Sequence, residues 1–155
     1  MKIRLIIVGK GKSDLIDDEL KYFKRIEKYI KIERVVLDIK HVKNSSEELI
    51  KIKEAESILS ILDKKSHIVL LDEKGAEYSS TQFSKWIENR LNTSKPITFI
   101  IGGAYGFSQD IYDCAHEKIA LSKLTFTHHM VRLFFAEQLY RAFTIMRNEP
   151  YHHGK

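Results

Sequence analysis

Five short apolar runs recur along the chain and predict five β-strands. Each run is rich in β-branched or other large apolar residues, and the runs cover residues 3–8, 35–39, 68–71, 97–101 and, more weakly, 119–121. Continuous apolar runs of this length are typical of strands that are buried on both faces. Pro96 cannot donate a ladder hydrogen bond, so it marks the start of the fourth strand.

Helical patterns fill the intervals between these strands. The first follows Ser13, the second follows a capping box at residues 45–48, and the third begins at a capping box from Ser79 to Gln82. Apolar positions at helical spacing predict the buried side chains: Leu15, Ile16, Leu20, Phe23, Ile26 and Ile30 in the first helix, Leu49, Ile52, Ala55, Leu59 and Leu62 in the second, and Phe83, Trp86, Ile87 and Leu91 in the third. This alternation predicts an α/β fold, with a mostly parallel sheet, helices on both faces and a ligand crevice beyond the carboxyl ends of the strands.

The last predicted helix, residues 129–147, differs from the others because apolar side chains surround it almost completely. A single core-facing stripe cannot account for so many apolar positions. We therefore expect a homodimer in which this helix packs partly on its own sheet and partly on its symmetry mate. The alternative is a central helix that is buried within one subunit.

Composition narrows the class of protein. One domain over residues 1–155 is expected, and 43% hydrophobic with 30% charged residues is ordinary for a soluble globular protein. The formal net charge of +5 is compatible with a nucleic-acid partner, although interspersed Lys and Glu on a solvated surface explain it equally well. The apolar run from Leu5 to Val8 is too short for a membrane span or a signal peptide. Cys114 is the only cysteine, which fits a reducing compartment, so we expect a cytoplasmic protein.

Two short motifs suggest a nucleotide-binding site and a metal site, but each lacks residues that such a site needs. The segment from Gly9 to Ser13 would need a glycine at Asp14 to be a dinucleotide fingerprint, and a glycine at Ile6 to be a P-loop. A helix-capping turn explains this segment instead. The histidine pairs at 128–129 and 152–153 are adjacent in sequence and rarely direct both rings at one ion, so we expect no metal site.

Two features follow predicted strands directly. Asp72 and Glu73 come after the third strand, where they would serve in acid–base chemistry or simply form a turn with the residues that follow. Gly102, Gly103 and Gly106 come after the fourth strand, and glycines permit positive φ and a close approach of backbone amides to a ligand. A tight turn before a helix capped by Ser108 is the alternative for this glycine loop.

The glycine loop and three later segments together resemble the RlmH family, bacterial SPOUT-class methyltransferases that modify a pseudouridine of large-subunit ribosomal RNA. The resemblance covers most of residues 68–152. Besides the glycines, its distinctive parts are the frame from Leu121 to Thr125 leading to His128 and Arg132, the block EQLYRA at residues 137–142, and the ending Pro150-Tyr151-His152.

This resemblance implies a fold, a cofactor and a reaction. The fold is a SPOUT-type α/β domain with a deep C-terminal trefoil knot, and the active form is a homodimer. The implied reaction transfers a methyl group from S-adenosylmethionine to N3 of a pseudouridine, without a metal, in ribosomal RNA of the large subunit within the assembled ribosome. Carried over by position, the implied cofactor site comprises Leu71, Gly102, Gly103, Leu121, Ser122, Lys123, Leu124, Thr125 and Phe126.

For this reaction we expect four catalytic residues: His128, Arg141, Tyr151 and His152. His128 would accept or relay the imide proton, since histidine titrates near neutrality. Arg141 would stabilise the anionic base or hold a phosphate, while Tyr151 and His152 lie in a tail expected to reach the neighbouring subunit's site. The alternatives are a cap hydrogen bond for His128, an ion pair with Glu137 for Arg141, and a frayed end for the tail.

Two rival functions stay open at this point. One is a catalytically silent RNA-binding dimer with the same fold. The other is a methyltransferase of this class with a different target, such as a ribose 2′-hydroxyl or another base.

Overall fold

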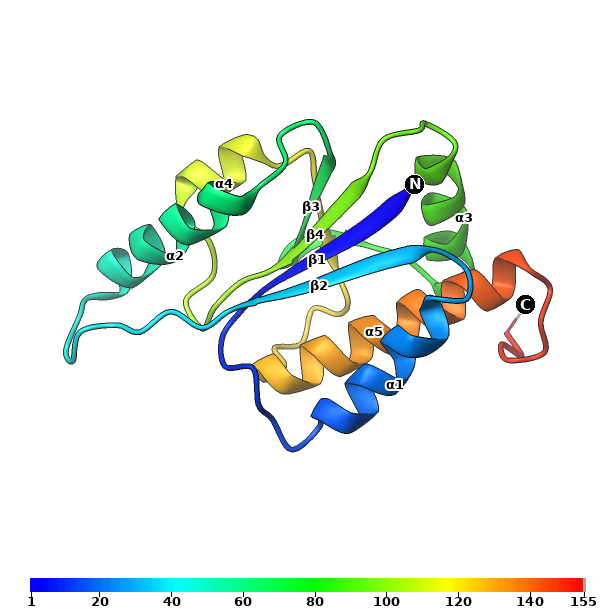
Figure 1. Cartoon of the computed structure of the whole chain (residues 1–155), viewed down its shortest axis with the longest axis horizontal. Helices are drawn as coiled ribbons and strands as arrows, with labels where there is room; N and C mark the ends of the chain where they lie inside the picture. The colour runs from blue at the N-terminus through cyan, green and yellow to red at the C-terminus, as the bar shows by residue number, and fades with distance from the viewer. Residues whose placement is uncertain (155) are drawn as a thin grey trace.

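A single parallel sheet organises the computed structural model, which describes residues 1–154 (Figure 1). The strand order is β2-β1-β4-β3-β5, and each neighbouring pair is parallel. The strands are β1 (Lys2–Val8), β2 (Lys31–Leu37), β3 (His67–Glu77), β4 (Ile97–Ile101) and β5 (Glu117–Ala120). The predicted α/β class with a mostly parallel sheet is confirmed, while the knot in the C-terminal half stays a prediction.

Helices cover both faces of this sheet. They are α1 (Ile16–Ile26), α2 (Glu47–Ile61), α3 (Ser80–Leu91), α4 (Gln109–Cys114) and α5 (His128–Met146). Figure 1 shows α2 and α4 on one side of the strands and α1, α3 and α5 on the other. Strand β1 supplies both cores, because Ile3, Leu5 and Ile7 pack in the cluster under α1, α3 and α5, whereas Ile6 and Val8 pack in the cluster under α2 and α4.

The N-terminal caps of α2 and α3 differ, although a capping box is predicted for both helices. Helix α3 has the complete predicted capping box, in which the Ser79 side chain accepts from the Gln82 backbone and the Gln82 side chain accepts from the Ser79 backbone. In α2 only one half forms, because Ser46 accepts from Leu49 while Ser45 donates to the carbonyl of Val42. The box predicted at residues 45–48 is therefore a single N-cap.

The predicted buried faces of α1 and α2 need correction. Leu49 and Ile52 are exposed, whereas the predicted Ala55 is buried together with Glu54 and Ile58. The other two predicted residues, Leu59 and Leu62, are half-buried. Apolar residues lie on several sides of α2, so helical spacing alone could not select the face that meets the sheet. In α1 the exception is Leu20, which is 45% exposed although Phe23 and Ile26 are buried. The other predicted residues, Leu15, Ile16 and Ile30, are half-buried. At α4, Ser108 occupies the N-cap position but its side chain makes no cap bond.

Strand β3 is longer than predicted because it contains a bulge. Leu71 and Ala76 both pair with Ile119 of β5, so residues 72–75 are extruded from the ladder. Gly75 lies against the neighbouring strand so closely that an added Cβ would be 2.5 Å from the Lys118 carbonyl carbon and 2.6 Å from the Ile119 nitrogen. The bulge thus requires a glycine here, and it directs residues 72–74 away from the sheet.

Helix α5 lies at the centre of its layer, between α1 and α3 (Figure 1). Phe135, Ala136, Leu139 and Phe143 form its buried stripe against the sheet. The apolar residues on its other sides, Val131, Leu133, Phe134, Tyr140, Ile145 and Met146, are half-buried. Within one chain, therefore, the helix is only partly covered, and the predicted homodimer stays a prediction.

Candidate cofactor pocket and catalytic residues

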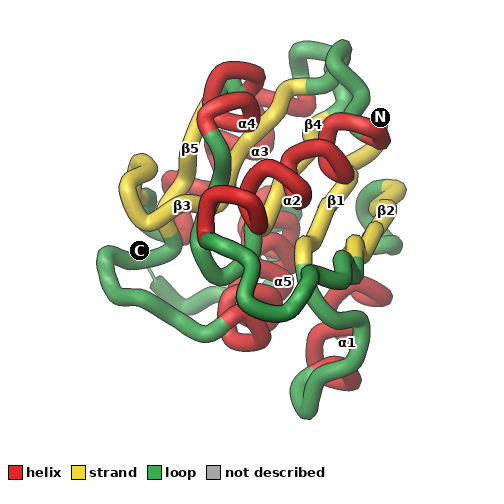
Figure 2. The backbone as a smooth tube through the Cα atoms, turned by 90° about the vertical axis from the view of Figure 1, so that its left-hand side faces the viewer, coloured by secondary structure: helices red, strands yellow, loops and turns green. Residues whose placement is uncertain are grey.

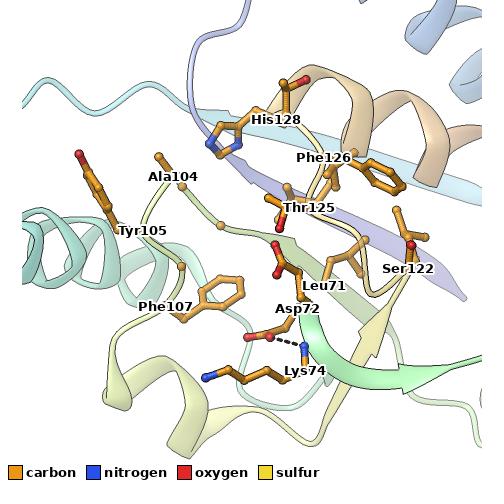
Figure 3. Close-up of a pocket in the computed structure, with 18 of the residues that line it drawn as sticks. Leu71, Asp72, Lys74, Ala104, Tyr105, Phe107, Ser122, Thr125, Phe126 and His128 are labelled. Atoms are coloured by element: carbon orange, nitrogen blue, oxygen red, sulfur yellow. Dashed lines mark hydrogen bonds between the residues drawn. The ribbon is translucent and has the colours of Figure 1, made fainter.

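A pocket of about 760 Å³ lies at the carboxyl ends of β4 and β5 and beside the bulge of β3 (Figure 3). Figure 2 traces the backbone of these strands and of the loops that connect them. Its walls come from the end of β3 and its bulge, the glycine loop after β4, the loop after β5 and the first turn of α5. A volume of this size is in the range that holds drug-sized ligands and cofactors. The predicted place of the ligand crevice is confirmed by this geometry.

Most of the predicted cofactor residues line this pocket. They are Leu71, Gly102, Gly103, Leu121, Ser122, Leu124, Thr125 and Phe126. Lys123 is the exception, because its side chain is 87% exposed and lies 3.8 Å from the Glu77 carboxylate outside the pocket. In the loop itself, Ser122 accepts a hydrogen bond from the Leu124 nitrogen at 3.0 Å, which turns the chain between β5 and α5.

The three glycines of the loop serve different purposes. Only Gly106 has a positive φ, +79°, and its nitrogen donates to the Gly103 carbonyl at 3.1 Å to close a four-residue turn. An added Cβ at Gly102 would be 2.8 Å from the Phe107 ring, and one at Gly103 would be 2.5 Å from the Glu54 carboxylate. The expectation that these glycines supply positive φ thus holds only at Gly106. At Gly102 and Gly103 the missing Cβ leaves space for the side chains of Phe107 and Glu54.

Glu54 supports the glycine loop from the side of α2. Its side chain is buried, and one carboxylate oxygen contacts the His41 Nε2 at 3.3 Å. Burial raises the pKa of Glu54, and the His41 contact opposes that shift. The loop is therefore held between the Phe107 ring on one side and a poorly hydrated carboxyl group on the other.

Asp72 is a pocket residue that the sequence left undecided between a turn and a chemical role. In the structure Asp72 takes part in a turn and also lines the pocket. One carboxylate oxygen accepts a hydrogen bond from the Lys74 nitrogen at 2.8 Å, and the other accepts one from the Tyr112 hydroxyl (Figure 3). Burial and this carboxylate raise the pKa of Tyr112 to about 12, so the phenol remains a donor. The bulge of β3 brings the Asp72 carboxylate to the wall of the pocket.

His128 is the first residue of α5 and lines the same pocket. Burial lowers the pKa of its imidazole below the usual 6.5, and the charges of Arg132 and His129 lower it further. Its ring is therefore neutral at physiological pH and has a nitrogen free to accept a proton. No cap hydrogen bond from a side chain forms at this helix start, so the capping alternative for His128 does not apply.

Arg132 fixes the start of α5 against the loop between β1 and α1. Its side chain is fully buried and donates to the Lys10 carbonyl at 2.7 Å. The guanidinium also fills the space where a side chain at Gly9 would lie. The segment from Gly9 to Ser13 is thus a turn tethered to α5, in keeping with the incomplete nucleotide motifs there.

The other three predicted catalytic residues form a separate cluster at the far end of α5. Arg141 pairs with Glu137 at 3.0 Å and contacts His152 Nδ1 at 3.0 Å, while the Tyr151 hydroxyl donates to Glu137 at 3.0 Å. Thirteen residues separate Arg141 from His128 on one helix, a rise of about 20 Å. The tail is folded back on its own helix, and one chain alone does not bring this cluster to the pocket.

A turn at the end of α5 directs the tail back in this way. Asn148 has a φ of 54°, its nitrogen donates to the Ile145 carbonyl, and the Glu149 nitrogen donates to the Thr144 carbonyl. This pair of bonds is the Schellman pattern, with asparagine in the left-handed position. In the structure Tyr151 and His152 contact Glu137 and Arg141 of α5. The predicted ion pair between Arg141 and Glu137 is also present.

Comparison with known proteins places the chain in a family. A family model described as "Predicted SPOUT methyltransferase" matches residues 1–152. Proteins named ribosomal RNA large subunit methyltransferase H are similar over 99% of both chains, with 50% identity in Christiangramia forsetii and 51% in Flavobacterium johnsoniae. The chain belongs to the RlmH family of SPOUT methyltransferases. The resemblance drawn from the sequence motifs is thereby confirmed.

The fold of this SPOUT methyltransferase also has a more distant likeness among solved structures. The structure of a probable methylase family protein from Haemophilus influenzae Rd KW20 superposes with a TM-score of 0.55. The match covers 94% of this chain and 66% of that one at 14% sequence identity, so it supports the fold alone.

Several pocket residues of this RlmH-family protein were not predicted as site residues. They are Asp72, Lys74, Ala104, Tyr105, Phe107, Tyr112, Thr127 and Val131. For some of them the sequence signal was a place directly after an apolar run, as with Asp72 after residues 68–71 and Ala104 and Tyr105 after residues 97–101. Tyr112 and Val131 lie on helices and carried no such signal. Over residues 1–154, no group of three His, Cys, Asp or Glu side chains is arranged to hold a metal, and no helix is long and apolar enough to cross a membrane.

Proposed function

We propose that this protein transfers a methyl group from S-adenosylmethionine to N3 of a pseudouridine in large-subunit ribosomal RNA. The carrying observation is the pocket that joins the glycine loop, the loop of residues 121–126 and a neutral His128 in one cavity. Family membership supports the reaction class, and the printed names of the curated relatives support the RNA. By family resemblance the target is pseudouridine 1915 of 23S RNA.

The pocket residues fit the cofactor. Leu71, Leu121 and Phe126 offer apolar surface for an adenine ring, while the backbone groups of the two loops offer donors and acceptors for its edge. The Asp72 carboxylate at the wall suits a ligand that carries hydroxyl groups and positive charge. S-adenosylmethionine, when bound, supplies a methyl group on a positively charged sulfonium.

Positioning and proton transfer are the two contributions that the chain itself makes. Holding reactants in line accounts for about 7–11 kcal/mol of a barrier, while a general base contributes about 10²- to 10⁴-fold in rate. A neutral His128 is suited to accept the imide proton of the target base, because its lowered pKa keeps a ring nitrogen unprotonated at neutral pH. Positioning by the pocket walls therefore lowers the barrier more than proton transfer to His128 does.

We further propose a homodimer in which the tail cluster of one subunit completes the pocket of the other. Arg141, Tyr151 and His152 lie together but about 20 Å from His128 along α5 in the same chain. Burial and hydrogen bonding raise the pKa of Tyr151, and Glu137 raises the pKa of Arg141, so the cluster presents a neutral phenol and a guanidinium. These groups are suited to an anionic base or a phosphate of the RNA.

The outer face of α1 and α5 supports this assembly. The Arg25 guanidinium lies there, 5.5 Å from the Tyr22 ring centroid and 5.6 Å from that of Tyr140. Tyrosine and arginine are enriched at the centres of protein interfaces. A second copy of α5 on this face would cover the half-buried apolar residues that its own chain leaves accessible.

Methyl mapping tests the proposed reaction. The purified protein is incubated with S-adenosylmethionine and ribosomes or free ribosomal RNA that lack the modification, and the methyl group is located by mass spectrometry. A methyl on N3 of one large-subunit pseudouridine is expected, with assembled ribosomes as the better substrate. A methyl group on a ribose or on another base would contradict the proposed target and favour a methyltransferase with a different one. If calorimetric titration with S-adenosylmethionine gave no heat, the catalytically silent RNA-binding dimer would be favoured. Action in the cytoplasm stays a prediction.

A further inference from the structure

Tyr105 is an exposed aromatic residue on the wall of the cofactor pocket. Its side chain is 47% exposed, whereas the neighbouring Phe107 is buried beneath the same loop. An exposed ring of this size at a pocket, with no packing role in the core, has apolar surface available to a partner. Neither the cofactor residues nor the four catalytic residues account for it.

The turn that carries Tyr105 is well defined. Ala104 and Tyr105 are the two central residues of the turn that the Gly106 nitrogen closes on the Gly103 carbonyl. Gly106 supplies the positive φ at the end of the turn, and Glu54 and Phe107 pack against its base. The backbone position of Tyr105 is therefore set by a closed four-residue turn rather than by a long loop.

Tyr105 lies at the His128 end of the pocket. Figure 3 shows Tyr105 and His128 on the two sides of one end of the lining, whereas Phe126 and Ser122 lie toward the other end. The apolar residues suited to an adenine ring, Leu71 and Phe126, are thus separated from Tyr105 in the same cavity. The end of the pocket that holds His128 thus also carries Tyr105, with Ala104 between the two side chains in Figure 3.

We propose that the Tyr105 ring stacks on the target nucleobase and holds its imide edge toward His128. The ligand class is an unpaired, splayed-out base, because a nucleotide within a stack cannot present its ring nitrogen inside a cavity. Aromatic side chains bind such bases through their faces, and the ring of Tyr105 is large enough to cover a pyrimidine. This inference rests on the proposed function and adds to it a base-stacking residue.

Substitutions at Tyr105 separate stacking from other roles. Tyr105→Phe keeps the ring and removes the hydroxyl, Tyr105→Leu keeps apolar surface without a π face, and Tyr105→Ala removes both. Because the side chain is half exposed, none of these changes opens a cavity in the core. Leu49→Ala is the matched control, since Leu49 is an exposed apolar residue on α2, outside the pocket.

The measurements are kcat/KM for methylation of unmodified ribosomes and the Kd for S-adenosylmethionine by calorimetry. Stacking predicts that Tyr105→Ala lowers kcat/KM by about 5- to 150-fold, that Tyr105→Leu lowers it by an intermediate factor, and that Tyr105→Phe and Leu49→Ala leave it within about twofold. The Kd for S-adenosylmethionine is expected to stay within about twofold in all four variants, because the adenine end of the pocket is unchanged.

Three results would overturn the stacking role. Unchanged kcat/KM in Tyr105→Ala would show that the ring is not needed, and an equal loss in Tyr105→Phe would assign the role to the hydroxyl. A parallel loss of S-adenosylmethionine affinity in Tyr105→Ala would assign the ring to the cofactor. A wild-type protein that methylates no RNA would overturn the proposed function and this inference with it. An active wild type combined with any of the three results above would overturn the stacking role alone, so the two failures are distinguishable.

Discussion

His128 shows how one residue's surroundings select its chemistry. It is the first residue of α5, it borders the pocket, and burial together with Arg132 and His129 lowers its pKa. A cationic imidazole there would be poorly solvated and would lie close to the Arg132 guanidinium, so the neutral form is favoured. The same environment that disfavours the proton on the free enzyme leaves a base ready for the imide proton of the substrate.

The pH dependence of turnover tests this role. Because the folded-state pKa of His128 lies below 6.5, the neutral base is present throughout neutral pH and is lost only on acidification through that lowered value. We expect kcat/KM to be flat near pH 7 and to fall about tenfold per pH unit well below pH 6.5. His128→Gln should lower kcat/KM by about 10²- to 10⁴-fold and abolish this acidic limb. An unchanged limb in His128→Gln would assign the titration to another group.

The glycines around the pocket are a second lesson at this scale. Sequence reasoning placed Gly102, Gly103 and Gly106 at a ligand loop but treated them as equivalent. In the structure only Gly106 needs its backbone freedom, whereas Gly102 and Gly103 leave space for Phe107 and Glu54. Phe107 belongs to the same loop, but Glu54 lies on α2, about fifty residues earlier in the chain, so no local pattern could pair it with Gly103.

At the scale of elements, the bulge in β3 shapes the wall of the pocket. If β3 continued as a regular strand, residues 72–75 would pair with β5. Asp72 would then not reach its partners, the Lys74 nitrogen and the Tyr112 hydroxyl. The bulge depends on a close passage of Gly75 against the β5 backbone. A local irregularity in one strand therefore determines where the Asp72 carboxylate borders the pocket.

Gly75→Ala tests this dependence. The added methyl would lie 2.5 Å from the Lys118 carbonyl carbon, and backbone cannot yield as a flexible side chain can. We expect the free energy of unfolding to fall by about 1–3 kcal/mol, measured by urea denaturation, with weaker binding of S-adenosylmethionine. Gly11→Ala is the control, because nothing lies within 4 Å of a Cβ at Gly11. Equal stability of the two variants would contradict a tight strand crossing at the bulge.

At the scale of the whole molecule, the four residues that we propose as catalytic are divided between two places. The pocket with His128 lies at the start of α5, and the cluster of Arg141, Tyr151 and His152 lies at its end. A rigid helix keeps these ends apart, so a site that uses both must be built from two chains. This division makes dimerisation part of the proposed catalysis rather than a feature added to it.

Mixed dimers test the shared site. His128→Ala and His152→Ala should each be inactive or nearly so as homodimers. After the two are mixed and allowed to exchange subunits, half of the random dimers carry one intact site, so about one quarter of wild-type activity is expected to return. Methyl transfer to ribosomes is the readout, with unexchanged mixtures as the control. If no activity returns although subunit exchange has been verified, each site uses residues of one chain.

The sequence by itself determined the local elements and the place of the site. Apolar runs predicted the strands, with β2 starting earlier at Lys31 and β3 running on to Glu77, and the Ser79 box marked the start of α3. Residues after β4 and β5 predicted most of the pocket, because in a parallel sheet the carboxyl ends of neighbouring strands meet at one edge. These features depend on backbone propensity and on periodicity, which act over a few residues.

Only the tertiary structure decided the arrangements that depend on distant contacts. It decided that α2 turns Glu54 inward, that the bulge places Asp72 in the wall, that Lys123 points outside, and that the tail folds back on α5. Each outcome follows from packing between segments that are far apart in the chain. The local sequence allows several conformations and side-chain directions at these positions, and close packing against another element selects one of them.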